Sequence, residues 1–258
     1  MDKIELKTEC WDEGAPIGNG KIGSIVYGSN PIKITVDRTD LWDLRPNEVT
    51  LEKGFNYANL VRLSTSGIPE DWKERERLFE DIFMGKPYPS KITAGRIELF
   101  FTPRLEDARY VLDTSAIVKI YDGDELVAEI FTDYISLVGV IKLRREADLK
   151  LHVPTYLSSA SETGSGIGDK DVGVTLGYPK AEIKTDGDFK WYEQKTHTDY
   201  SFGIVTKNVG DEIYYTLATT DDDKDYVSFA KNALDAAVEI GFDKLFVAHK
   251  RSWQRCNK

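Results

Sequence analysis

The chain has 258 residues and a formal net charge of −10, from 44 acidic and 34 basic side chains. This balance argues against a nucleic-acid partner, because phosphate binding relies on clustered Lys and Arg. The hydrophobic fraction of 41% suffices for a sizeable core, and no run approaches the ~20 apolar residues of a membrane span, so no membrane partner is expected.

The cysteines and histidines form no pattern typical of a metal site or a disulfide framework. Cys10 and Cys256 lie near opposite ends of the sequence, so two free thiols are expected, with a single bridge as the alternative. The histidines, His152, His197 and His249, are far apart, and we expect each to be structural or on the surface. We therefore predict neither a metal nor a cofactor.

The first informative stretch runs from residue 11 to residue 46 and is rich in glycine, tryptophan and aspartate. Glycine at this density indicates tight turns or close backbone approaches. Residues 22–27 and 32–36 are rich in β-branched side chains and are predicted to be strands. Trp42 follows among aspartates, a grouping that suits the apolar face and hydroxyl edges of a sugar ring. On composition alone, however, a buried anchor with solvated neighbours is the expected role of Trp42.

The same stretch contains a match to the dinucleotide fingerprint G-x-G-x-x-G at residues 18–23. That fingerprint requires a strand before it and a helix after it. Residues 12–16 do not have the pattern of a strand, and residues 24–27 do not have that of a helix. We therefore reject a nucleotide site.

The first predicted helix covers residues 66–83, after a loop over residues 50–59. Pro69 suits the first turn, and Trp72 is expected to pack in the core because apolar residues recur at helical spacing. Gly85 is predicted to end the helix.

The rest of the chain predicts a series of short strands separated by turns. Turn signals occur at Asp122-Gly123, at Asp186-Gly187 and at residues 208–210, and residues 156–170 are predicted to be a surface loop. About ten strands with hairpin turns favour a large antiparallel sandwich. The predicted strands are residues 97–102, 116–121, 126–131, 135–143, 149–155, 172–178, 181–185, 189–194, 202–207 and 213–219.

Two helices are predicted at the end of the sequence, over residues 226–240 and 242–255, with Gly241 between them. The acidic run at residues 221–223 precedes them. Its spacing does not follow a calcium-binding loop, so a solvated turn or a helix N-terminus is expected.

A family resemblance lies in residues 11–42. Trp11 is followed by PIGNGKIG at residues 16–23, an apolar strand and Leu41-Trp42. This pattern resembles the amino-terminal domain of inverting α-L-fucosidases (glycoside hydrolase family 95), which precedes an (α/α)6 barrel. The family usually has Asn-Glu-Asp-Thr where this chain has residues 37–40, and Ser-Gly-Gly-Pro where it has residues 43–46.

The resemblance implies a mainly β fold, a large antiparallel β-sandwich (supersandwich) with two or three helices. The sandwich domain would cover residues 1–241, with a helix at about 68–84. Residues 242–258 would form a C-terminal helix or linker toward an (α/α)6 catalytic barrel located beyond this chain. A secreted or periplasmic location is what the family implies, although the first residues lack the apolar region of a signal peptide.

Inverting glycosidases need two carboxyl groups roughly 6.5–9.5 Å apart, and the resemblance places that pair in the barrel. We therefore assign no catalytic residue, and expect a non-catalytic domain of a glycoside hydrolase whose partners are carbohydrate, α-L-fucosides among them, and the barrel. The alternatives are a stand-alone carbohydrate-binding module and a purely structural sandwich. Candidates for the rim of a sugar site or for an interdomain contact, with core roles open for both tryptophans, are Trp11, Asn19, Asp37, Asp40 and Trp42.

Overall fold

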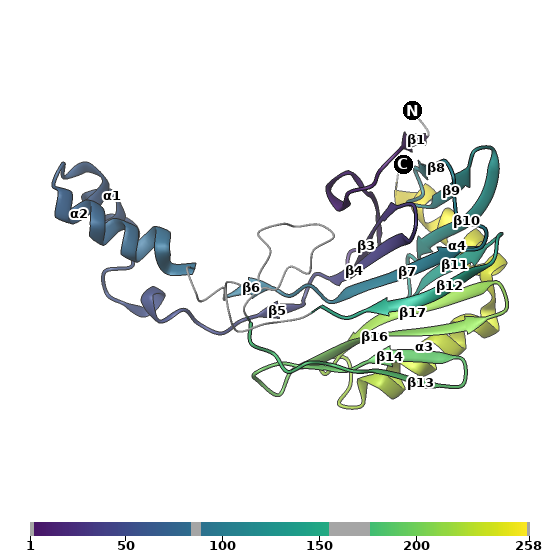
Figure 1. Cartoon of the computed structure of the whole chain (residues 1–258). Helices are drawn as coiled ribbons and strands as arrows, with labels where there is room; N and C mark the ends of the chain where they lie inside the picture. Colours follow the sequence, from purple (N-terminus) through teal and green to yellow (C-terminus); the bar gives the residue numbers. More distant parts are fainter. Residues whose placement is uncertain (1–2, 84–88, 155–175, 257–258) are drawn as a thin grey trace.

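Two antiparallel β-sheets pack face to face in the computed structural model, which describes residues 3–83, 89–154 and 176–256 (Figure 1). This confirms the predicted fold class, a mainly β antiparallel sandwich. The described residues also contain four α-helices, of which one, α1, was not predicted from the sequence.

The larger sheet, sheet A, has ten strands in the order β1-β8-β9-β10-β11-β17-β16-β14-β13, and β15 pairs with β16. The three predicted turns are confirmed, because they connect β9 to β10, β13 to β14 and β16 to β17. The strands are β1 (Lys3–Leu6), β8 (Ala108–Asp113), β9 (Val118–Asp122), β10 (Glu125–Thr132), β11 (Gly139–Leu143), β13 (Ile183–Asp186), β14 (Phe189–Tyr192), β15 (Gln194–Lys195), β16 (Ser201–Val209) and β17 (Glu212–Thr219).

The smaller sheet, sheet B, has five strands in the order β12-β7-β4-β3-β2. Side chains alternate between its two faces along each strand. In β4 the apolar residues Ile32, Ile34 and Val36 are fully buried toward sheet A, whereas Thr35 and Asp37 are on the outward face. The strands are β2 (Ala15–Gly18), β3 (Ile22–Gly28), β4 (Ile32–Arg38), β7 (Gly95–Phe101) and β12 (Ala147–His152).

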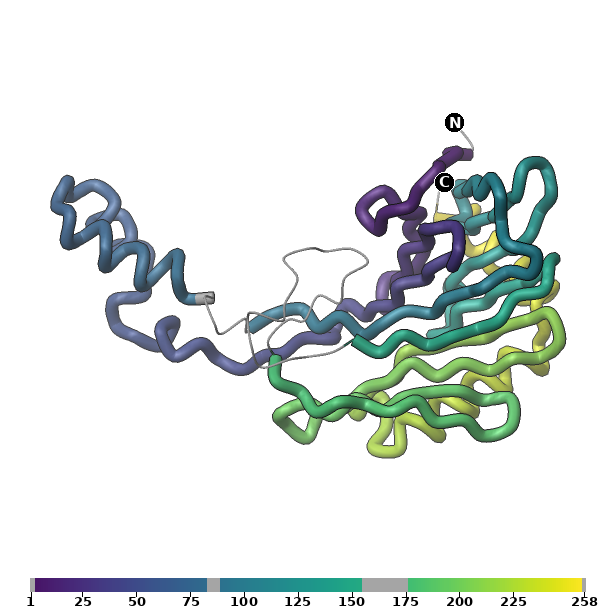
Figure 2. The backbone as a smooth tube through the Cα atoms, in the orientation of Figure 1, coloured from purple at the N-terminus to yellow at the C-terminus, as the bar shows by residue number. Residues whose placement is uncertain are grey.

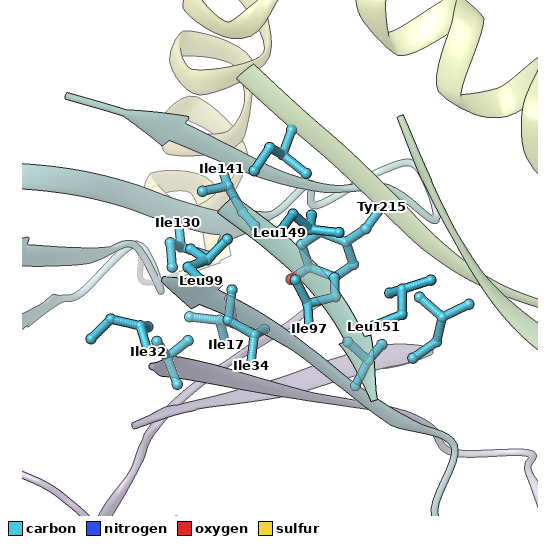
Figure 3. Packing of buried hydrophobic residues seen from close by; sticks show 14 of the residues in the cluster. Ile17, Ile32, Ile34, Ile97, Leu99, Ile130, Ile141, Leu149, Leu151 and Tyr215 are labelled. Carbon is cyan, nitrogen blue, oxygen red and sulfur yellow. The ribbon is translucent and has the colours of Figure 1, made fainter. Parts of the chain in front are cut away.

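The main hydrophobic core lies between the two sheets (Figure 3). Ile34 and Ile97 of sheet B face Ile141 and Tyr215 of sheet A in this layer. The phenol oxygen of Tyr215 is 3.1 Å from Ser24 Oγ, so the one polar atom of this ring has a partner inside the core. The burial of this layer is what holds the sandwich together.

Helices α3 (Tyr226–Ile240) and α4 (Phe242–Cys256) cover the other face of sheet A, and both confirm the predicted helices. A second apolar cluster joins them to the sheet; it includes Phe131 of β10, Leu234 of α3 and Leu245 of α4. Helix α4, expected as a C-terminal helix or linker, therefore packs on sheet A. Neither α3 nor α4 packs on the outward face of sheet B (Figure 1).

An arm formed by residues 44–83 extends away from both sheets (Figures 1 and 2). It starts after the short strand β5 (Trp42–Asp43), which pairs with β6 (Ser90–Lys91). It contains the 3-10 turn Glu48–Leu51, α1 (Tyr57–Thr65), α2 (Pro69–Arg75), a π-helical turn (Glu76–Glu80) and a 3-10 turn (Asp81–Phe83).

Three predictions for residues of the arm differ from the structure. Residues 50–59 are not a continuous loop, because α1 begins at Tyr57. The next helix begins at Pro69 instead of residue 66, although Pro69 does occupy the first turn. Trp72 is 48% exposed and does not pack in the core. The predicted stop at residue 85 lies outside the described residues.

Two further predictions also differ from the structure. Residues 15–18 form β2, so the fingerprint match at residues 18–23 does follow a strand, but the next element is the antiparallel strand β3 instead of a helix. Of the strand predicted at residues 172–178, residues 176–178 are not in a strand and the others lie outside the described residues, as does the loop at 156–170. Among the described helices, none is long and apolar enough to span a membrane.

Candidate functional site

A cavity of about 480 Å³ lies on the outward face of sheet B. We call it the sheet B groove. Residues of β2, β3, β4, β7 and β12 line it, together with Trp11 and the segment that follows β6. None of the described helices covers this face. Lining residues used below are Trp11, Ile25, Tyr27, Thr35, Asp37, Lys91, Arg96 and His152.

Trp11 reaches the groove because the chain turns tightly against β3. The amide of Gly14 donates a hydrogen bond to Trp11 O at 3.1 Å and closes the 3-10 turn Trp11–Glu13. A Cβ at Gly14 would lie 2.3 Å from Ile25 Cγ2, so only glycine permits this approach. Trp11 is half-buried, and its indole N–H donates to no residue that the structure describes.

Asp37 supplies the acceptor of the groove. Its Oδ1 accepts hydrogen bonds from the backbone amide of Arg38 at 2.7 Å and from Lys91 Nζ at 3.0 Å. Burial raises the pKa of the Asp37 carboxyl, and the neighbouring Lys91 ammonium opposes that rise. No residue in the described part of the chain donates to Oδ2, so one carboxylate oxygen is open to a ligand.

Lys91 is held in place by β6 and by its acceptors. Besides Asp37, its ammonium donates to Arg38 O and, at 3.4 Å, to Leu41 O. An ammonium has three N–H donors, and these three contacts use them. Lys91 therefore orients and neutralises Asp37, and adds no spare positive charge to the groove.

Register brings further polar groups to the same face. Thr35 of β4 pairs with Arg96 of β7, which in turn pairs with His152 of β12. Arg96 Nε donates to Glu98 Oε1 at 2.7 Å, so its charge is also compensated. The Thr35 hydroxyl lies 3.4 Å from the phenol oxygen of Tyr27. The groove thus combines apolar surface with hydroxyl, carboxylate and indole groups.

Asp40 lies in a neighbouring ion-pair network around Arg38, whose side chain is fully buried. Arg38 Nη2 is 2.7 Å from Asp40 Oδ2, and Nη1 donates to Asp222 and, at 3.0 Å, to Leu217 O. Arg38 lowers the pKa of Asp40. For Asp222, burial alone would raise the pKa, but the guanidinium outweighs it and lowers the pKa. Residues 221 and 222 are in a turn just before α3, and Asp221 and Asp223 are exposed, as expected for a solvated turn or a helix N-terminus. The exception is Asp222, whose side chain is only 5% exposed.

Asn19 occupies the turn between β2 and β3 and does not line the groove. Its Oδ1 accepts from the amides of Lys21 and Ile22 at 3.1 and 2.9 Å. Its amide group donates to Asp133 O and Ser136 O at 2.9 and 2.6 Å, which attaches this turn to sheet A. The position therefore has a structural role in joining the two sheets.

Trp42 lies beside the groove and is not the buried anchor expected from composition. It is 45% exposed, and its indole N–H donates to Thr39 O at 2.8 Å. Lys91 Nζ is 5.8 Å from the centroid of its ring. Among the five candidate residues, Trp11 and Asp37 thus both line the groove, whereas Asp40 and Trp42 contact the lining residues Arg38 and Lys91.

Sequence reasoning did not find Thr35, Lys91, Arg96 or His152. Strand alternation could have placed Thr35 on the same face as Asp37. Arg96 and His152 come from β7 and β12, and the register of sheet B brings them to the groove. Lys91 is on β6, and its pairing with β5 brings it there.

Neither the known protein-family models nor the curated proteins gave a match to this chain. Within residues 3–83, 89–154 and 176–256, no three His, Cys, Asp or Glu side chains are arranged to hold a metal ion. Both cysteines are free thiols.

Proposed function

We propose that this chain is the non-catalytic amino-terminal sandwich domain of a glycoside hydrolase that acts on carbohydrate, with α-L-fucosides among the candidate substrates. Its role would be to support an (α/α)6 catalytic barrel in the same polypeptide. The sequence pattern at residues 11–42 and the mainly β sandwich both support this proposal.

The observation that carries the proposal is the apolar surface of the arm. Scattered exposed apolar side chains are ordinary, but a concentration of large ones on one projecting element marks an interaction site. The helical surface of a barrel is a partner that would bury them. On the described arm they are Leu44 (76% exposed), Leu51 (72%), Tyr57 (80%), Val61 (42%), Ile68 (50%) and Trp72 (48%).

The base of the arm is fixed to the sandwich by polar contacts around Asp43. Tyr178 OH and Arg45 Nη2 both donate to Asp43 Oδ2 at 2.6 Å. Arg45 Nη2 also donates to Leu176 O at 2.9 Å. Asp43 is 5% exposed, so these bonds satisfy a carboxylate that would otherwise be costly to bury. Such a base lets the sandwich hold the arm in a defined direction, as a supporting domain must.

A stand-alone carbohydrate-binding module is the second candidate. The sheet B groove favours it, because the groove combines Trp11 with the open oxygen of Asp37 and needs no barrel. The two candidates differ in whether the arm has a partner.

The test is to express the complete source reading frame and compare it with the 258-residue chain. We expect the frame to continue into several hundred residues, the full product to hydrolyse a glycoside, and the present chain to be inactive. A Tyr57→Asp, Trp72→Asp variant should lower the activity or the melting temperature of the full product. Ile135→Asp is the matched control, since Ile135 is 79% exposed but on the sandwich.

Two results would contradict the proposal. Hydrolysis by the 258-residue chain alone, lost on replacing an acidic residue, would show that it contains the catalytic pair. A frame that stops at residue 258, with a well-behaved monomer, would favour the binding module instead.

A further inference from the structure

We propose that the sheet B groove binds a neutral saccharide, with a sugar ring stacked on Trp11 and its hydroxyl groups hydrogen-bonded to Asp37. This inference rests on the carbohydrate part of the proposed function but needs neither the arm nor a barrel.

The first argument is the size and place of the groove. Its volume of about 480 Å³ lies inside the ~300–1,000 Å³ that small-molecule sites occupy in proteins. Most of its lining residues are on strands, which hold side chains more rigidly than loops do. The described residues thus provide a preformed site for a small ligand.

The second argument is the position of Trp11. An indole ring offers a large apolar face together with one N–H donor, so it suits a ligand that is apolar on one side and polar at its edge. A half-buried indole whose N–H has no partner among the described residues is available for both contacts. The close approach at Gly14 fixes the turn that carries the ring.

The third argument is the acceptor that Asp37 leaves open. Lys91 and the Arg38 amide hold Oδ1, which fixes the carboxylate plane and leaves Oδ2 available to accept a hydrogen bond from a ligand hydroxyl. Hydrogen bonds to an ionised acceptor are about twice as strong as neutral ones. A hydroxyl-rich ligand therefore gains most from this arrangement.

The charge balance of the groove selects a neutral ligand over an anion. Lys91 lies 3.0 Å from Asp37, and Arg96 lies 2.7 Å from Glu98. Each positive charge already has a carboxylate beside it. An anion would have to compete with those carboxylates, whereas a neutral sugar needs only donors and acceptors.

The experiment is calorimetric titration of the full chain with L-fucose, D-galactose, D-glucose, D-xylose and short neutral oligosaccharides, with D-glucuronate as the charged comparison. We expect at least one neutral saccharide to bind. Trp11→Ala and Asp37→Asn should each weaken that binding by about tenfold or more, which corresponds to ~1.4 kcal/mol. Trp72→Ala is the matched control, because Trp72 is on the arm and should leave the affinity unchanged.

Circular dichroism checks that each variant is folded. If Trp11→Ala fails to fold, Trp11→Phe and the NMR shift of the Trp11 indole N–H on titration replace it. Absence of binding across the neutral panel, equal affinity in the groove variants, or binding of glucuronate alone would overturn the inference. None of these outcomes alters the arm experiment, so failure of the groove and failure of the supporting role can be distinguished.

Discussion

At the scale of single residues, Arg38 is the most demanding side chain in the sandwich. Burying a guanidinium is costly unless carboxylates and other acceptors beside it compensate its charge. Here Asp40, Asp222 and a backbone carbonyl surround it. The contact with Asp222 joins sheet B to the turn that follows β17, so one residue connects both sheets.

Replacing Arg38 should expose this dependence. Arg38→Met removes the guanidinium from the buried Asp222 carboxylate and leaves only Lys21 Nζ, at 3.1 Å, and the Thr219 amide, at 3.0 Å, beside it. Breaking a buried pair in this way costs about 3–5 kcal/mol. Urea unfolding followed by tryptophan fluorescence measures the loss. The double variant Arg38→Met, Asp222→Leu should recover a substantial part of it, since the buried carboxylate is then removed too, and the side chains of Asp40 and Lys21 are 42% and 44% exposed to water. Equal stability of the single and double variants would contradict this account.

At the scale of elements, α4 depends on a buried histidine. His249 Nε2 lies 2.6 Å from Ser115 O, and because a carbonyl only accepts, Nε2 carries the proton. The ring centroid lies 4.8 Å from that of Phe131. Nδ1 has no partner among the described residues. The helix is therefore attached to sheet A through a neutral imidazole.

Acidification should weaken this attachment. Burial lowers the pKa of folded His249 below its usual 6.5, and the nearby Lys250 acts in the same direction, against the opposing effect of the Ser115 carbonyl, Asp133 and Asp113. Between the folded and unfolded pKa values the unfolded chain binds more protons, so stability rises with pH and falls as the pH drops below about 6.5.

The measurement is the free energy of unfolding at pH 7.5, 6.5 and 5.5, chosen as about one unit on either side of that value. His249→Gln should lose part of the decrease seen in the unmodified chain. An identical decrease in the variant would show that other groups are responsible.

The sequence predicted some elements well and others poorly, for identifiable reasons. Residues 226–240 show a clear apolar stripe that ends at a glycine, and α3 has those bounds. Helix α1 has only nine residues, so its apolar spacing repeats too few times to be distinguished from a loop, although the Asn56 side chain caps its first turn. Helical spacing identified the apolar side of α2, but spacing cannot show whether anything covers Trp72.

At the scale of the whole molecule, sheet A is shared by two cores. Its inner face packs on sheet B and its outer face on α3 and α4. Loss of either layer would expose an apolar face of the same sheet. The two layers should therefore unfold together in one cooperative transition.

Two core variants test this cooperativity. Leu99 lies between the sheets, and Leu234 of α3 lies in the outer cluster; both are fully buried. Leu99→Ala and Leu234→Ala should each cost about 2–5 kcal/mol. Far- and near-ultraviolet circular dichroism should show a single coincident transition in both variants. An early, separate loss of helix signal in Leu234→Ala would show that the helical layer is an independent unit.

The sequence predicted only part of the candidate site. Trp11 and Asp37 could be selected because both lie in one glycine-rich stretch, close in sequence. Arg96 and His152 belong to β7 and β12, and their place in the groove follows from pairing across sheet B. Such pairing depends on contacts distant in sequence, which a local pattern does not contain.

The edges of sheet A have a consequence for self-association. In the described chain, β1 and β13 are the terminal strands of the sheet, and each has unpaired backbone groups along one side. Both carry alternating charges: Lys3 and Glu5 on β1, and Lys184 and Asp186 on β13. A second copy adding its own strand would have to strip water from these charges, which is how natural sheets resist growth into fibres. The charges on β1 and β13 thus oppose edge-to-edge association through sheet A.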